Sequence, residues 1–79
     1  MTPAIARWLL ERAERELAEM RELAFRTEGD LRYFRRLKDG MRIFDDGIAA
    51  HEARLTVHMR RAAELEHVVA DLKKIAEGT

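Results

Sequence analysis

The sequence predicts an all-α protein: an antiparallel helical hairpin with a short first helix and a long heptad-patterned second helix, forming a homodimeric helical bundle. Three observations support this prediction. Apolar residues recur at spacings of three and four, residues that start and end helices flank the apolar stripes, and Glu–Arg pairs at i, i+4 occupy the polar faces. A monomeric three-helix bundle is the alternative. The 79 residues are too few for more than one domain, so residues 1–79 are expected to form a single helical domain.

The first helix is expected over residues 3–27. Thr2 is a suitable N-cap, and Pro3 fits the first helical position because its missing amide hydrogen has no partner there. Apolar residues then recur along one face at helical spacing. They are Ala6, Leu10, Ala13, Leu17, Met20 and Ala24, with Leu9 and Leu23 beside them.

A turn is expected at residues 28–30. Gly29 suits the left-handed residue that ends many helices, and Asp30 is a good N-cap for the next one. A connection this short makes the flanking helices antiparallel neighbours. The long second helix is expected over residues 30–77 and ends near Gly78.

Residues 45–47 leave the second helix open to an alternative. Asp45-Asp46-Gly47 has the composition of a loop, and a break there would give three helices, over residues 3–27, 30–44 and 48–77. Against a break, the apolar spacing passes through these residues without a change of phase. We therefore expect one continuous helix.

A heptad seam runs along the expected second helix. Apolar residues alternate with spacings of three and four, as at the a and d positions of a coiled coil. Only His51 and His58 interrupt the apolar character, and both occupy d positions. The seam consists of Phe34, Leu37, Met41, Phe44, Ile48, His51, Leu55, His58, Ala62, Leu65, Val69, Leu72 and Ala76.

The unequal lengths of the two expected helices predict self-association. At about 1.5 Å per residue the first helix is about 37 Å long and the second about 70 Å, so the first covers the second only to about residue 54. An uncovered apolar stripe favours an antiparallel homodimer, or contact with another helical protein. Trp8 lies off the first stripe and is a further contact candidate. The expected interface residues are Leu55, Ala62, Leu65, Val69, Leu72, Ala76 and Trp8.

His51 and His58 are candidate ligands of a transition metal or of haem, because neutral imidazole binds zinc, copper and haem iron. They are seven residues apart, about 10.5 Å along a helix, so each needs a second ligand, which a partner chain could supply. The alternative is that both are structural residues whose hydrogen bonds fix the register of the helices. We expect no cofactor.

The segment 32–42 offers another alternative, nucleic-acid binding. It carries five basic residues, and Tyr33 could stack on a base. The net charge of the chain is zero, and the arginines fall on the solvent face of the predicted coiled coil, so nucleic acid is not the expected partner. The basic residues are Arg32, Arg35, Arg36, Lys38 and Arg42.

Composition limits the remaining classes of function. With no cysteine the chain cannot form a disulfide or a thiolate metal site, and its longest apolar run is far too short to span a membrane. The N-terminus does not resemble a signal peptide, so we expect a cytoplasmic protein. The sequence contains no catalytic triad pattern, glycine-rich phosphate loop or inward pair of carboxylates. We therefore expect an interaction or scaffold module and not an enzyme.

Overall fold

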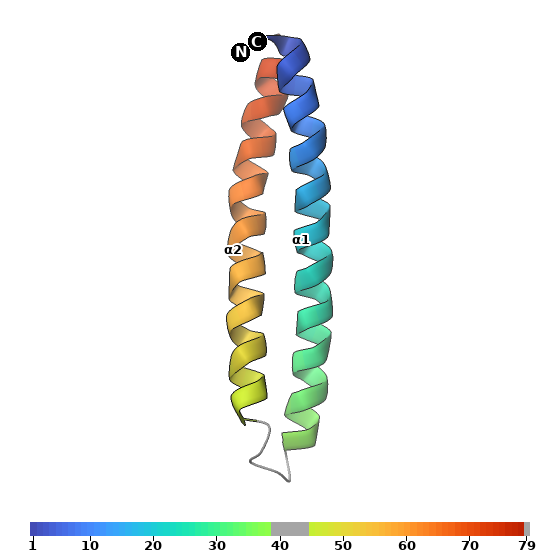
Figure 1. Cartoon of the computed structure of the whole chain (residues 1–79), viewed down its shortest axis with the longest axis vertical. Coiled ribbons are helices and arrows are strands. Elements are labelled where there is room, and N and C mark those ends of the chain that lie inside the picture. Colours follow the sequence, from blue (N-terminus) through green and yellow to red (C-terminus); the bar gives the residue numbers. More distant parts are fainter. Residues whose placement is uncertain (39–44, 79) are drawn as a thin grey trace.

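A computed structural model shows two antiparallel α-helices (Figure 1). It describes residues 1–38 and 45–78. Helix α1 spans Pro3–Lys38 and helix α2 spans Asp45–Ala76. The pair is 58 Å long and 13 Å across in both other directions, and the start of α1 lies beside the end of α2. The prediction of an all-helical hairpin is therefore confirmed for the described part of the chain.

The ends of the helices follow the expected signals. The hydroxyl of Thr2 accepts a hydrogen bond from the amide of Ile5 at 3.3 Å, which is N-cap geometry. Asp45 and Asp46 stand in the first turn of α2, where a carboxylate interacts favourably with the helix dipole. At the far end Gly78 has a positive φ of 76°, and its amide donates to the carbonyl of Ile75 at 3.1 Å.

The predicted turn at residues 28–30 is wrong, because α1 continues through it. The apolar stripe of α1 extends past Ala24 through Thr27 and Leu31 to Phe34, and Leu31 is only 1% exposed. Thr27 is tolerated in this row because its hydroxyl donates to the carbonyl of Leu23 at 2.8 Å. A glycine inside a helix, such as Gly29, destabilises it by about 1 kcal/mol. Burying a leucine side chain, such as Leu31, stabilises the fold by about 1.5–3 kcal/mol, so the continuous helix is the more stable arrangement.

The predicted long helix over residues 30–77 is also wrong. Residues 30–38 belong to α1, and α2 begins only at Asp45, so the two arms are nearly equal, at 36 and 32 residues. The three-helix alternative fails for the same reason, since residues 3–27 and 30–38 lie in one helix. Residues 45–47, whose composition suggested a loop, form the first turn of α2. The seam residues Met41 and Phe44 lie outside the described residues.

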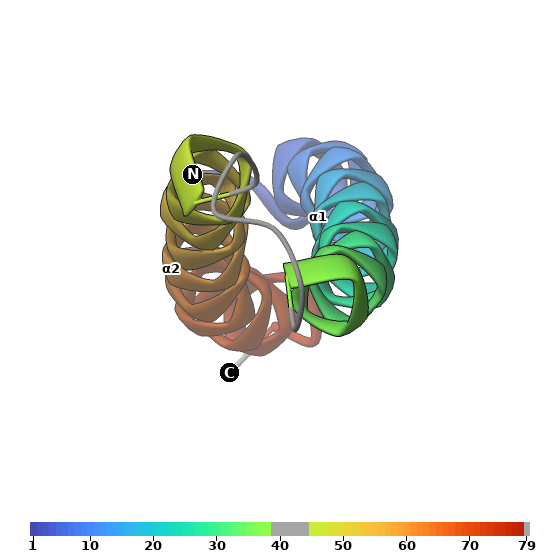
Figure 2. The same ribbon diagram turned by 90° about the horizontal axis from the view of Figure 1, so that it is seen from below.

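A narrow apolar core joins the two helices. The alanines of α1 allow α2 to approach closely, and half-buried residues such as Leu10 and Met20 pack against this core. Seen along the long axis, the helices lie side by side in a single layer (Figure 2). The buried members of the core are Ala6, Ala13 and Leu17 of α1 and Ala62, Leu65, Val69 and Leu72 of α2.

Ion pairs between the helices fix their register. Guanidinium–carboxylate distances are 3.0 Å for Arg21–Glu66, 3.2 Å for Arg35–Glu52 and 2.9 Å for Arg61–Glu16. All six side chains are substantially exposed, so water and salt screen these pairs and each contributes little to stability. In the observed alignment they join α1 to α2 at three points along the hairpin. Neither described helix has an apolar stretch long enough to traverse a bilayer.

Candidate functional site

The predicted dimer interface on the second helix lies inside the hairpin. Ala62, Leu65 and Val69 are buried in the core against α1 of the same chain, together with Leu72. Leu55 and Ala76, at the two ends of this row, are half-buried. The expected uncovered stripe does not arise, because α1 extends to Lys38 and covers α2 along its whole length. A dimer would therefore have to use a different surface.

Trp8 lies outside this core. It is 56% exposed, and the guanidinium carbon of Arg12 lies 5.0 Å from the centre of its ring. This cation–π contact joins two residues four positions apart on α1. Trp8 is thus an exposed aromatic side chain with a partner on its own helix.

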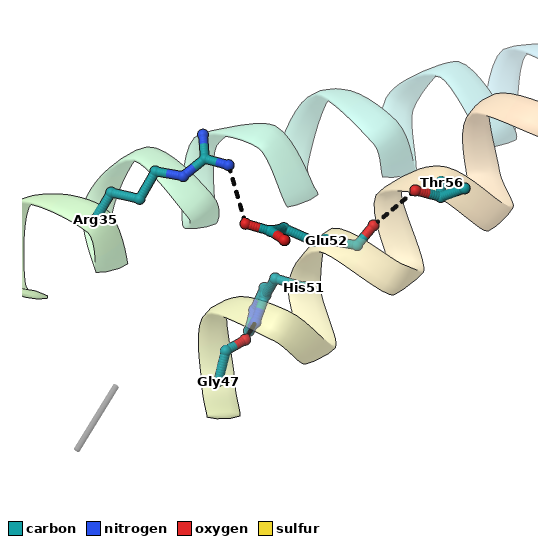
Figure 3. A network of polar contacts seen from close by, with 5 residues as sticks. All are labelled: Arg35, Gly47, His51, Glu52 and Thr56. Atoms are coloured by element: carbon teal, nitrogen blue, oxygen red, sulfur yellow. Dashed lines mark hydrogen bonds and ion pairs between the residues drawn. The ribbon is translucent and has the colours of Figure 1, made fainter. Parts of the chain in front are cut away.

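His51 connects the start of α2 to the end of α1. Its Nδ1 lies 2.7 Å from the carbonyl oxygen of Gly47 (Figure 3). Because a carbonyl oxygen only accepts, Nδ1 is the donor in this contact. Nε2 lies 4.0 Å from Oδ2 of Asp30, and the ring of Phe34 packs against the imidazole at a centroid distance of 4.9 Å. The imidazole is 18% exposed, so its second nitrogen faces the Asp30 carboxylate at the edge of the core.

The two candidate ligands are not brought together. His58 is half-buried two turns further along the same helix, about 10.5 Å from His51 in rise. The described residues contain no group of three His, Cys, Asp or Glu side chains placed to hold a metal ion. The hydrogen bond of His51 to Gly47 lies within α2 and does not join the two helices, so a role of His51 in fixing their register also stays a prediction. Metal or haem binding by His51 and His58 stays a prediction.

The basic segment is partly neutralised within the chain. Arg32 pairs with Glu28 at 3.2 Å, and Arg35 pairs with Glu52 across the hairpin, as Figure 3 shows. Tyr33 is exposed and contacts Phe34 edge to face at 5.9 Å. Residues 39–42 lie outside the described residues. Nucleic-acid binding by this segment stays a prediction.

Grooves flank the core in the described part of the chain, and the sequence did not reveal them. The first has a volume of about 680 Å³, and charged side chains occupy its walls. In its wall the guanidinium of Arg61 donates a hydrogen bond to the carboxylate of Glu16 at 2.9 Å. This hydrogen bond, together with the negative charge of Glu16, raises the pKa of Arg61 above its ordinary value. The first groove is lined by Leu9, Arg12, Ala13, Arg15, Glu16, Glu19, Arg61, Leu65, Val68 and Leu72.

The second groove has a volume of about 390 Å³ and is mostly apolar. Phe25 stands at its edge and is 77% exposed, and Met59 is also exposed. Phe25 and Met59 are large apolar residues that do not belong to the apolar stripe of either helix. In the sequence, this was the only indication of an apolar surface outside the core. The second groove is lined by Arg21, Ala24, Phe25, Glu28, Leu55, Met59, Ala62, Ala63 and Glu66.

Comparison with protein-family models, with curated proteins and with solved structures gave no significant match. The function is therefore inferred from the residues and surfaces described above.

Proposed function

We propose that this protein is a small helical interaction or scaffold module that acts as a homo-oligomer, most simply as a homodimeric four-helix bundle. The observation that carries this proposal is the set of large apolar side chains left exposed on the hairpin. Six large apolar side chains on α1 and α2 are more than half exposed to water. They are Ile5, Trp8, Phe25, Tyr33, Val57 and Met59.

Two helices in a single layer bury only one narrow stripe each. Chains of this size are marginally stable on their own and are commonly stabilised by oligomerisation. A second hairpin laid over one groove would turn the single layer into two layers and cover apolar side chains that now face water. Closed two-fold pairing is the commonest way to achieve this. Another helical protein is the alternative partner.

The proposed role is binding and not catalysis. In the described part of the chain, arginines and glutamates form ion pairs across the hairpin, such as Arg21–Glu66 and Arg61–Glu16. Such pairs hold the register of the helices, and neither groove brings together a nucleophile and a general base. A cytoplasmic location stays a prediction from composition.

Thermal unfolding tests the proposal. If folding is coupled to dimerisation, the melting temperature should rise by roughly 5–10 °C over about a hundredfold increase in protein concentration, because association stabilises the folded state by mass action. Circular dichroism melts at matched buffer and scan rate would measure this. A melting temperature independent of concentration, together with a monomer mass, would contradict self-association.

A further inference from the structure

The second groove and Phe25 form a protrusion and a hollow on one surface. The groove walls are made largely of small or flexible side chains, including Ala24, Ala62, Ala63 and Met59. Phe25, at the edge, exposes 77% of its surface to water. A large aromatic side chain beside an apolar hollow is the arrangement found at the centre of protein interfaces, where the ring of one partner fills a pocket of the other.

Charged residues along the same side of α1 alternate in sign. Arg7, Glu14, Arg21, Glu28 and Arg35 recur every seven residues, so they lie in one row along the helix. Arg21 and Glu28 line the second groove. Glu14 and Arg21 line a further hollow of about 360 Å³, which shares Arg21 and Glu66 with the second groove. The row therefore runs beside Phe25 on the groove side of the hairpin.

We propose that this surface is the homodimer interface, with α1 antiparallel to the α1 of a second copy and with Phe25 of each chain in the second groove of the other. This inference rests on the proposed function and adds the face and the orientation. The two-fold axis passes between Ala24 and Phe25. About that point Arg21 faces the partner's Glu28, and Glu14 faces the partner's Arg35, so the four residues of the row between Glu14 and Arg35 meet opposite charges.

Ion pairs within the chain are compatible with this pairing. Glu66 and Glu52, the carboxylates of α2 on this side, are already bound by Arg21 and Arg35 at 3.0 and 3.2 Å. A guanidinium has five N–H donors and can bind two carboxylates at once. Each arginine can therefore keep its ion pair within the chain and also bind a glutamate of the second chain. Glu14 forms no ion pair with another described residue, and the dimer gives it one.

The same features favour a second copy over a different partner. A protrusion and its hollow lie in one patch, and the charge row complements itself when it is reversed, which is what an isologous two-fold contact requires. The first groove lacks this property, because five of its lining side chains are charged and none is aromatic. Near the axis the two Phe25 rings would be shielded from water by the surrounding charged residues.

Replacing Phe25 tests the face. Phe25→Ser should weaken dimerisation by roughly a hundredfold or more, because two rings are lost from the centre of each interface. Trp8→Ser is the matched control, since Trp8 is also an exposed aromatic of α1 and lies outside the second groove. Sedimentation equilibrium would give the dissociation constants, and circular dichroism would verify that both variants stay helical. A dimer weakened by Trp8→Ser and unaffected by Phe25→Ser would overturn the proposed face.

Disulfide cross-linking tests the orientation, since the wild-type chain has no cysteine. A chain carrying Arg21→Cys and Glu28→Cys should form a covalent dimer on mild oxidation. The two cysteines cannot join within one helix, where they are about 10.5 Å apart and a disulfide needs Cα atoms about 4.4–6.8 Å apart. The control carries Glu19→Cys and Arg26→Cys, with the same spacing on α1; Glu19 lines the first groove.

The outcomes separate the two proposals. A covalent dimer from the Arg21/Glu28 variant and none from the Glu19/Arg26 variant supports the antiparallel interface. If the wild-type chain dimerises but only the control cross-links, or neither does, the face or the orientation is wrong while the proposed function stands. If the wild-type chain is monomeric at every concentration, both proposals fail.

Discussion

Replacing Gly29 with proline should destabilise the hairpin by about 3 kcal/mol or more, because α1 runs without interruption from Pro3 to Lys38. Proline would remove a hydrogen bond and clash with the preceding turn in the middle of this helix. Gly29→Ala should do the opposite and stabilise the protein by about 0.5–1 kcal/mol, since a Cβ at Gly29 meets no atom within 4 Å. Urea unfolding followed by circular dichroism would measure both changes.

A second glycine provides the control for Gly29. Gly78 has a positive φ of 76°, so Gly78→Ala should leave stability unchanged or lower it, although the added methyl group also meets nothing within 4 Å. If residues 28–30 formed a turn, Gly29→Ala would resemble Gly78→Ala and Gly29→Pro would be tolerated. That pair of results would contradict a continuous α1.

Leu31→Ala should lower the free energy of unfolding by about 2–5 kcal/mol, the range for removing a fully buried leucine from a packed core. Leu31 is 1% exposed, and it lies in the part of α1 beyond the predicted turn. Leu23→Ala is the matched control, because Leu23 is 37% exposed on the same helix and should lose less than about 1 kcal/mol. Denaturant curves for both variants at one protein concentration would give the comparison.

Equal and small losses from the two leucine substitutions would show that the end of α1 does not pack as described. A larger loss from Leu23→Ala than from Leu31→Ala would mean that another face of α1 points toward α2. Either result would also remove the geometric basis of the second groove, since Phe25 and Leu31 are positioned by the same helix.

The sequence predicted the helical class and the antiparallel pairing, and it failed at the position of the turn. Local signals at Gly29 and Asp30 suggested a helix end, whereas the stripe of α1 continues through Thr27, a polar residue that was not counted as part of it. Thr27 can be buried because a carbonyl of its own helix accepts its hydroxyl hydrogen. Such a hydrogen bond forms only once the helix is present, so it cannot be recognised from the pattern of apolar residues in the sequence.

The heptad spacing of apolar residues also did not show where the first helix ends and the second begins. Phe34 belongs to the stripe of α1, yet it continues in phase with the seam of α2 from Ile48 onward, so one unbroken heptad pattern covers two helices. Ala62, Leu65, Val69 and Leu72 were predicted to lie uncovered and to contact a partner chain, whereas they pack against α1 of the same chain. The grooves depend on which residues lie opposite one another, and this follows only once the turn is placed.

Sedimentation equilibrium of the wild-type chain tests self-association most directly. Measured over a series of micromolar concentrations, the chain should show a monomer–dimer equilibrium in which the upper species has twice the 9.2 kDa mass of one chain. The fraction of this species should rise with concentration, as mass action requires. A single 9.2 kDa species at every concentration would contradict the proposed homo-oligomeric module.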